Sequence, residues 1–316
     1  MKKSFFLIGA ALLVAMAIIL ASCAPKPAQP STSATTSAAA KKIRIGVSYM
    51  TLSNPFFVSI NDAIKAGTDK GGIELIVADS QYDVAKQVKD VENFISMGVN
   101  AIILNPVDSQ GVVTAVQKAN DAKIPVLAID TTAASGDIAC HIASDNYQAG
   151  KVGAEFIAKQ LNGKGAVCLI DNQTIDVGIQ REKGVMDVFN QYPGIKVLGS
   201  QKGGSESDAL KIGEVWVQRF PDLDAVWGIN DQNAMGALTA YEQAGHSKLF
   251  VVGIDGIQES FDAMKDGRKF LATAAQQPDI IGKDAIENAV KIINGEKVDK
   301  EVQVPVKLIT KDNIPL

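Results

Sequence analysis

The feature that most constrains the fold is a regular alternation of two patterns from Ile43 onward. Short runs rich in Val and Ile alternate with longer amphipathic stretches, such as 84–98, 109–122 and 146–161. Near-continuous apolar strands separated by helices are typical of parallel sheets covered by helices on both faces. The predicted strands are 43–48, 73–79, 100–106, 125–130, 138–143, 165–171, 195–200, 224–229, 249–255 and 270–276.

About ten strands are too many for one sheet in a chain of this length, so we expect two sheets. The predicted fold class is α/β, with two doubly wound Rossmann-like lobes. The division falls near Ser144–Asn146, and the sequence after Gln276 supplies one more helix for the first lobe. The predicted lobes are 42–145 plus 277–306 and 146–276 plus 307–316.

The N-terminus reads as an export signal. Two lysines precede an apolar run from Phe5 to Ala21, and small residues follow before Cys23. This layout is typical of a secretory signal, and the ending LASC resembles a bacterial lipobox, in which the cysteine becomes the lipid-bearing first residue. We predict a lipoprotein signal over 1–22 and lipid attachment at Cys23, with an uncleaved membrane anchor as the alternative. Either interpretation places most of the chain outside the cytoplasm.

Residues 23–41 are dominated by Pro, Ser, Thr and Ala. Such a composition cannot bury enough surface to offset its ordering entropy, so a flexible tether to the membrane is expected.

Charge and cysteine content narrow the possible partners. A formal net charge of −4 argues against nucleic acid, which needs a basic face. Cys140 and Cys168 each lie in strand-like runs, and we favour two buried thiols, with a disulfide as the open alternative. His141 and His246 form no cluster with these cysteines at metal-ligand spacing, so neither a metal nor a cofactor is predicted.

Sequence signatures of common enzymes are missing. The sequence contains no phosphate-binding loop, no strand-borne G-x-G-x-x-G and no G-x-S-x-G elbow. A hydrolase that uses Asp130 and Asp255 as a carboxylate pair stays open as an alternative to a protein without catalysis.

Polar residues close many of the predicted strands. They are Asn54, Asp130, Asn230, Asp255 and Gln276. Any one of them could be an ordinary helix cap. In open α/β sheets, however, ligands bind beyond the carboxyl ends of the strands, so five such residues in two lobes favour a shared cleft.

These residue types suit recognition of a hydroxylated ligand. Asp and Asn can bind vicinal hydroxyls, and the planar fork of Arg181 can bridge an acid and a hydroxyl. A solvated helix position is the alternative for Arg181. Phe56 and Phe57, after an Asn-Pro turn, would stack on the C–H faces of a sugar ring, with core packing as the alternative for at least one of them.

The sequence resembles the bacterial ribose-type periplasmic sugar-binding proteins, the solute receptors of ABC importers, from Ile43 to about Ile309. The motifs that carry this resemblance are LSNPFFVSI, NPVDS, IPVLAID, HIASDN, REKG, INDQNAMGAL, VVGIDG and ATAAQQPDIIG. The resemblance implies a three-stranded hinge, closure on a monosaccharide or polyol, and delivery to a permease and its ATPase by a monomer without enzymatic activity. It also implies ligand contacts, which carry over to Asn54, Phe56, Phe57, Asp130, Arg181, Asn230, Asp255 and Gln276.

Two departures from the ribose binders bear on the ligand. Thr131 follows Asp130 where those proteins carry a second arginine, and the loop SQKGGSESDAL (200–210) lacks their aromatic residue. We include Thr131 among the ligand-binding candidates and predict a neutral sugar or polyol other than ribose. The rival hypothesis is that Trp227 or Tyr49 restores the lost ring and that ribose still fits.

Two other classes of protein use the same two-lobed fold. Sugar-responsive repressors need a helix-turn-helix before the first lobe, where this chain carries the lipobox and tether instead. A receptor that signals occupancy to a chemoreceptor or sensor kinase has the same sequence features as an importer component, so that alternative stays open.

Overall fold

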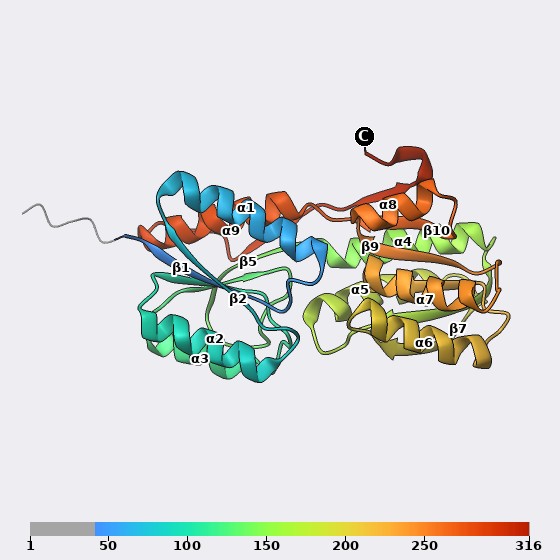
Figure 1. The fold of residues 1–316 in the computed structure, drawn as a ribbon, viewed down its shortest axis with the longest axis horizontal. Coiled ribbons are helices and arrows are strands. Elements are labelled where there is room, and N and C mark those ends of the chain that lie inside the picture. Colours follow the sequence, from blue (N-terminus) through green and yellow to red (C-terminus); the bar gives the residue numbers. More distant parts are fainter. Residues whose placement is uncertain (1–41, 316) are drawn as a thin grey trace, which may run out of the picture. The chain divides into compact units, whose positions relative to one another are not determined.

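Two six-stranded sheets organise residues 42–315, the part of the chain that this computed structural model describes (Figure 1). All neighbouring strands run parallel except β10 and β12, which are antiparallel. The first sheet has the order β11 (Glu301–Val304), β5 (Ile138–Ser144), β4 (Val126–Ile129), β3 (Ala101–Leu104), β1 (Arg44–Tyr49), β2 (Glu74–Asp79). The second has the order β12 (Lys307–Thr310), β10 (Phe270–Ala275), β9 (Phe250–Asp255), β8 (Ala225–Gly228), β6 (Lys164–Asp171), β7 (Gly194–Lys202).

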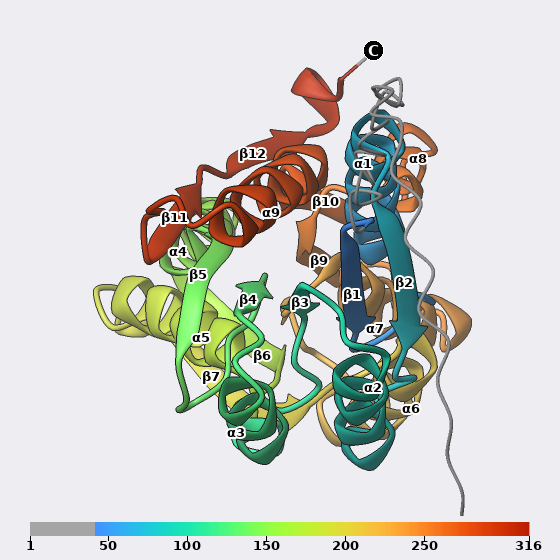
Figure 2. The ribbon, with the colours of Figure 1, turned by 90° about the vertical axis from the view of Figure 1, so that its left-hand side faces the viewer.

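Helices cover both faces of each sheet, and each sheet with its helices is called a lobe here. On the first sheet, α1 (Pro55–Gly71) and α9 (Pro278–Ile293) pack on one face, and α2 (Val84–Met97) and α3 (Val113–Asp121) pack on the other (Figure 2). The second sheet is covered by α4 (Asn146–Gln160) with α5 (Asp176–Phe189) on one face, and by α6 (Glu206–Arg219), α7 (Asp231–Gln243) and α8 (Gln258–Lys265) on the other. A short 3₁₀ helix, η1 (Lys311–Asn313), follows β12.

Apolar residues on both faces of the strands explain this layering. Ile45 and Val47 of β1 are fully buried on the α1 and α9 side, whereas Ile102 and Leu104 of β3 are fully buried on the α2 and α3 side. Burying one such side chain contributes about 1.5–3 kcal/mol. A sheet that is apolar on both faces therefore needs helices on both, as the alternating sequence predicts.

The chain passes between the lobes three times. β5 leads into α4, β10 leads into α9, and β11 leads into β12. The predicted two-lobed α/β fold with a three-stranded connection is therefore confirmed. β11 and β12 are absent from the predicted strands because each is only four residues long, is partly exposed, and lies next to the break at Pro305.

The cysteines of the two lobes do not pair. Cys140 lies in β5 of the first sheet and Cys168 in β6 of the second, and both are buried free thiols, as we favoured. Burial raises the pKa of Cys140 to about 11 and that of Cys168 to about 12, so both stay protonated and unreactive at neutral pH.

Two features are absent from residues 42–315. Within this range no helix has the length and apolar character needed to cross a membrane. The same residues contain no group of three or more His, Cys, Asp or Glu side chains arranged to hold a metal ion. The predicted signal over 1–22, the lipid site at Cys23 and the tether over 23–41 lie outside the described residues.

Candidate functional site

The strand order of each sheet predicts a binding crevice at the carboxyl ends of its strands. In the first sheet β1 lies between β2 and β3, and in the second β6 lies between β7 and β8. The helix after β1 (α1) packs on one face of its sheet, whereas the helices after β2 and β3 pack on the other. Such a reversal opens a crevice beyond the carboxyl end of the central strand, where ligands of α/β proteins bind.

A cavity of about 50 Å³ lies between these strand ends, with walls from both lobes. Every predicted ligand-binding residue except Thr131 lines it. Its lining residues are Met50, Asn54, Phe56, Phe57, Tyr82, Asp130, Asn172, Ile175, Val177, Arg181, Gly203, Gly204, Ile229, Asn230, Asn233, Asp255 and Gln276.

The two asparagines among the predicted residues are helix caps and cavity residues at once. The Oδ1 of Asn54 accepts from the Phe56 N–H at 2.8 Å, and the Oδ1 of Asn230 accepts from the Asn233 N–H at 2.9 Å. The amide of Asn54 also donates to Oδ2 of Asp255, in the other lobe, at 3.4 Å. One residue can therefore cap a helix and line the cleft, because a helix that begins just after a strand end has its N-cap residue beside the crevice.

Phe56 and Phe57 also serve two purposes. Both belong to the apolar core between β1, α1 and α9, and both line the cavity. Their rings meet edge to face with centroids 5.2 Å apart, and only 3% and 5% of their surfaces are exposed. Because the rings are fixed by core packing, they offer a rigid apolar wall to the cavity.

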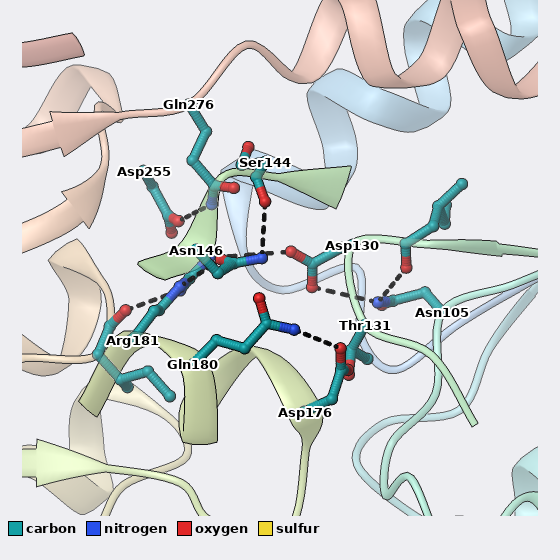
Figure 3. A network of polar contacts seen from close by, with 12 residues as sticks. Asn105, Asp130, Thr131, Ser144, Asn146, Asp176, Gln180, Arg181, Asp255 and Gln276 are labelled. Carbon is teal, nitrogen blue, oxygen red and sulfur yellow. Dashed lines mark hydrogen bonds and ion pairs between the residues drawn. The ribbon is translucent and has the colours of Figure 1, made fainter. Parts of the chain in front are cut away.

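Arg181 is a buried cation whose position is fixed by hydrogen bonds (Figure 3). Its Nε donates to Oδ1 of Asn146 at 2.7 Å, and its Nη1 donates to the carbonyl of Ile229 at 2.8 Å. Its Nη2 lies 3.9 Å from Oδ1 of Asp130, in the other lobe, without a hydrogen bond. The alternative of a solvated helix position for Arg181 is therefore wrong.

The carboxylates of Asp130 and Asp255 are both almost fully buried. Burial raises the pKa of Asp130 to about 6, although nearby Arg181 opposes this shift, and Asn105 donates to its Oδ2 at 3.4 Å. Burial, and after it the carboxylate of Asp231, raise the pKa of Asp255 well above its ordinary range. Asp255 accepts from the Gln276 amide at 2.7 Å, so only Asp130 keeps an oxygen without a partner.

Thr131 takes a different position from the one predicted. Its hydroxyl donates to Oδ1 of Asp176, the first residue of α5, and the Thr132 N–H donates to the same oxygen at 2.8 Å. Beside them, the Asp176 N–H donates to Oγ of Ser109 at 3.2 Å. Thr131 thus joins one lobe to the other beside the cavity and does not form its wall.

Sequence reasoning missed four lining residues with polar, aromatic or sulfur side chains, which are Met50, Tyr82, Asn172 and Asn233. Asn172 directly follows β6, so the strand-end rule could have found it. The amide of Asn233, in the first turn of α7, donates to the carbonyl of Gly204 at 3.1 Å. Trp227 and Tyr49, the rings of the rival hypothesis, are fully buried in the cores and do not line the cavity.

Four buried polar atoms of the lining have no hydrogen-bond partner among residues 42–315. They are Oδ1 of Asp130, Nη2 of Arg181, Oδ1 of Asn233 and Oε1 of Gln276. Buried polar groups are nearly always paired, and each unpaired one costs about 1–3 kcal/mol. Four of the nine such atoms among residues 42–315 belong to this one lining, as expected for a site whose bonds are completed by a polar ligand.

Comparisons with known proteins agree with this geometry. The periplasmic binding protein domain matches residues 45–297. The chain is 38% identical to the ribose import binding protein RbsB of Bacillus subtilis over 98% of this chain and all of the relative. It is 39% identical to the ribose import binding protein RbsB of Escherichia coli, over 88% of this chain and 95% of that protein.

A solved structure shows the same arrangement with a ligand. An ABC transporter solute binding protein from Bacillus halodurans, with bound myo-inositol, superposes with a TM-score of 0.81 and 32% identity, covering 86% of this chain and 96% of that one. With two doubly wound lobes and a polar cavity between them, the chain belongs to the periplasmic binding protein family.

Proposed function

We propose that the protein is an extracytoplasmic receptor that captures a monosaccharide or polyol between its lobes and delivers it to an ABC importer. The observation that carries this proposal is the set of four buried, unpartnered polar atoms that line one cavity. The protein would bind the solute without altering it, and its protein partners would be the permease and the ATPase of the importer. The relatives support it, since two are named ribose import binding proteins and a third holds myo-inositol.

A hydroxyl group fits the central pair of the site. Oδ1 of Asp130 can only accept and Nη2 of Arg181 can only donate. One hydroxyl oxygen placed about 2.8–3.0 Å from both would donate to the first and accept from the second. The two atoms come from different lobes, 3.9 Å apart, so such a ligand binds the closed arrangement better than an open one.

The three remaining roles follow the same logic. Oδ1 of Asn233 and Oε1 of Gln276 would accept from further hydroxyls. Phe56 and Phe57 would face the C–H surface of the ring. Asn54, Asn230 and Asp255 would hold their neighbours in place through the bonds described above and contact the ligand at the cavity wall.

We propose a ligand other than ribose. Position 131 offers a threonine already bonded to Asp176, so no second cation reaches the cavity from there. The loop over 200–210 brings no ring to the cavity, which it lines through Gly203 and Gly204. Both features favour a differently substituted ring, and a cyclic polyol such as the myo-inositol of the solved relative is the first candidate.

Calorimetry against ribose, hexoses and cyclic polyols tests the ligand, and small-angle scattering tests closure. We expect sub-micromolar binding of one hexose or polyol and a smaller radius of gyration on its addition. Tighter binding of ribose than of the other compounds would reject the choice of ligand. Unchanged scattering at saturation would reject closure.

We further propose a monomer anchored outside the cytoplasm by lipid on Cys23. The lobe boundaries of this proposal are 42–145 plus 277–306 and 146–276 plus 307–316, after a signal over 1–22 and a tether over 23–41. The LASC sequence supports the lipid anchor. The lobe boundaries are supported by the places where the chain crosses between the lobes, which are after β5, after β10 and between β11 and β12. Mass spectrometry of the native N-terminus should find a lipid-modified Cys23, and an intact Met1 would contradict this.

A further inference from the structure

Aromatic rings reach the cavity only from the first lobe, within residues 42–315. They are Phe56, Phe57 and Tyr82. Phe56 and Phe57 are packed in a core, whereas Tyr82 lies in the loop between β2 and α2 and is 38% exposed. Tyr82 is thus the one ring of this lining that core packing does not explain.

The surroundings of Tyr82 place it against the second lobe. A second hollow of about 310 Å³ adjoins the cavity, and the two share Met50, Tyr82, Asn172, Gly203 and Gly204. Tyr82 therefore lies where both hollows meet, on the side of the glycines. A Cβ on Gly203 would lie 1.9 Å from Oδ1 of Asn233, so the loop meets both hollows without a side chain at this position, and Tyr82 lines the same hollows from the other lobe.

The backbone holds Tyr82 in a conformation that few residues adopt. Gln81 and Tyr82 have φ angles of 54° and 60°, so two successive residues other than glycine lie in the left-handed region. Hydrogen bonds fix this turn, since the Tyr82 N–H donates to the Met50 carbonyl at 2.7 Å and the Gln81 N–H to Oδ1 of Asp79 at 2.9 Å. A strained turn that aims a large side chain at a ligand cavity is a feature of functional sites.

We propose that Tyr82 covers the ligand from the side of Gly203 and Gly204 and decides which sugar or polyol the site prefers. This inference rests on the proposed function. The loop over 200–210 brings no ring to the cavity, so the ring on this side of the ligand comes from the other lobe. Because Tyr82 borders the second hollow, it also limits how far a ring substituent extends in that direction.

The hydroxyl of Tyr82 keeps its proton at any physiological pH. Burial, followed by the carboxylates of Asp255 and Asp208 in the second lobe, raises the pKa of Tyr82 to about 12. The side chain therefore offers the ligand both a ring face and a hydrogen-bond donor.

The test compares Tyr82→Asn and Tyr82→Phe with Gln81→Asn in the full chain, by calorimetry with ribose, myo-inositol and a panel of hexoses. Asparagine is well tolerated in the left-handed region, so Tyr82→Asn removes the ring and keeps the backbone conformation. Gln81→Asn is the matched control, because Gln81 has the same backbone conformation but lines neither hollow. Thermal unfolding of each variant without ligand reports on folding separately.

We expect Tyr82→Asn to weaken the preferred ligand about tenfold and to change the ratio of affinities across the panel. Tyr82→Phe should keep that ratio within about threefold, and Gln81→Asn should bind like the wild type. Wild-type affinities and ratios in Tyr82→Asn would overturn this inference and leave the proposed function intact. A wild-type protein that binds no member of the panel would overturn the proposed function and this inference together.

Discussion

The two lobes share a fold but bring different chemistry to the cavity between them. The first lobe supplies the three rings together with Asn54 and Asp130, whereas the second supplies the cation and most of the amides. In the second lobe Arg181, Asn230, Asn233 and Asp255 are linked to their surroundings by hydrogen bonds that hold each side chain at the cavity. The first lobe therefore supplies the rings for stacking, and the second supplies most of the groups for directed hydrogen bonds.

This division explains why neither lobe alone would recognise a sugar. The aromatic rings of the first lobe alone would contact any apolar ligand surface. Arg181 of the second lobe alone would bind any anion or hydroxyl group. Selectivity needs both, and both are present only when the lobes meet. The following predictions test this division, beginning with the largest expected effect.

Removing the cation should abolish most of the binding. In Arg181→Ala, Oδ1 of Asp130 faces no positive charge across the lobes, and the ligand loses a charged donor. A hydrogen bond to a charged group contributes about 1.5–3 kcal/mol, and 1.4 kcal/mol is a factor of ten, so affinity should fall at least about tenfold. Calorimetry with the preferred ligand measures this.

Lys183→Ala is the matched control for that variant. Lys183 lies on the same helix but is exposed and pairs with Asp187 at 2.6 Å, away from the cavity. Its loss should leave binding unchanged. If Arg181→Ala bound as tightly as Lys183→Ala, the second lobe would not be the source of the directed bonds.

The carboxylate of Asp255 should make stability depend on pH. Its raised pKa means that the folded protein keeps a proton that the unfolded chain releases above about pH 4. This contribution to stability is complete below that pH and is lost as the pH rises toward the folded pKa. Asp255→Asn removes the titration, so its melting temperature relative to the wild type should rise by a few degrees between pH 5 and pH 8.

Thermal unfolding without ligand at both pH values provides the measurement, and the exposed Asp279→Asn serves as the control. A difference from the wild type that is the same at both pH values would show that Asp255 is not the buried acid we describe.

A smaller effect is expected at the contact between the lobes. Asp176→Ala removes the acceptor of the Thr131 hydroxyl and of the Thr132 N–H. Because these bonds join the two lobes, their loss should favour opening, and affinity should fall about threefold. Small-angle scattering of the ligand-free variant should give a larger radius of gyration than that of the wild type.

Gln180→Ala separates this effect from a change in α5 itself. Gln180 donates to the other oxygen of Asp176 at 3.3 Å and belongs to the same helix. It should alter neither affinity nor radius. An unchanged radius in Asp176→Ala would remove Thr131 from any part in closure.

The sequence predicted the fold and eight of the seventeen residues that line the cavity, because both depend on local patterns. Apolar strands identify the sheets, and the residues that follow them must lie at the carboxyl edge, which located Asp130 and Asp255. Tyr82 was not predicted, because the sequence of its loop does not indicate that Gln81 and Tyr82 both adopt left-handed backbone conformations. The position of Thr131 could not be predicted, since it depends on which residue of the other lobe meets it.

The bonds between Thr131, Thr132 and Asp176 involve protein groups alone, and this has a consequence for transport. They hold the two lobes together whether or not a solute is bound. An importer that recognises the closed shape would then also meet empty receptors, and each such encounter occupies the permease without delivering cargo. In that case the strength of this contact would set a balance between holding the solute firmly and unproductive encounters with the permease.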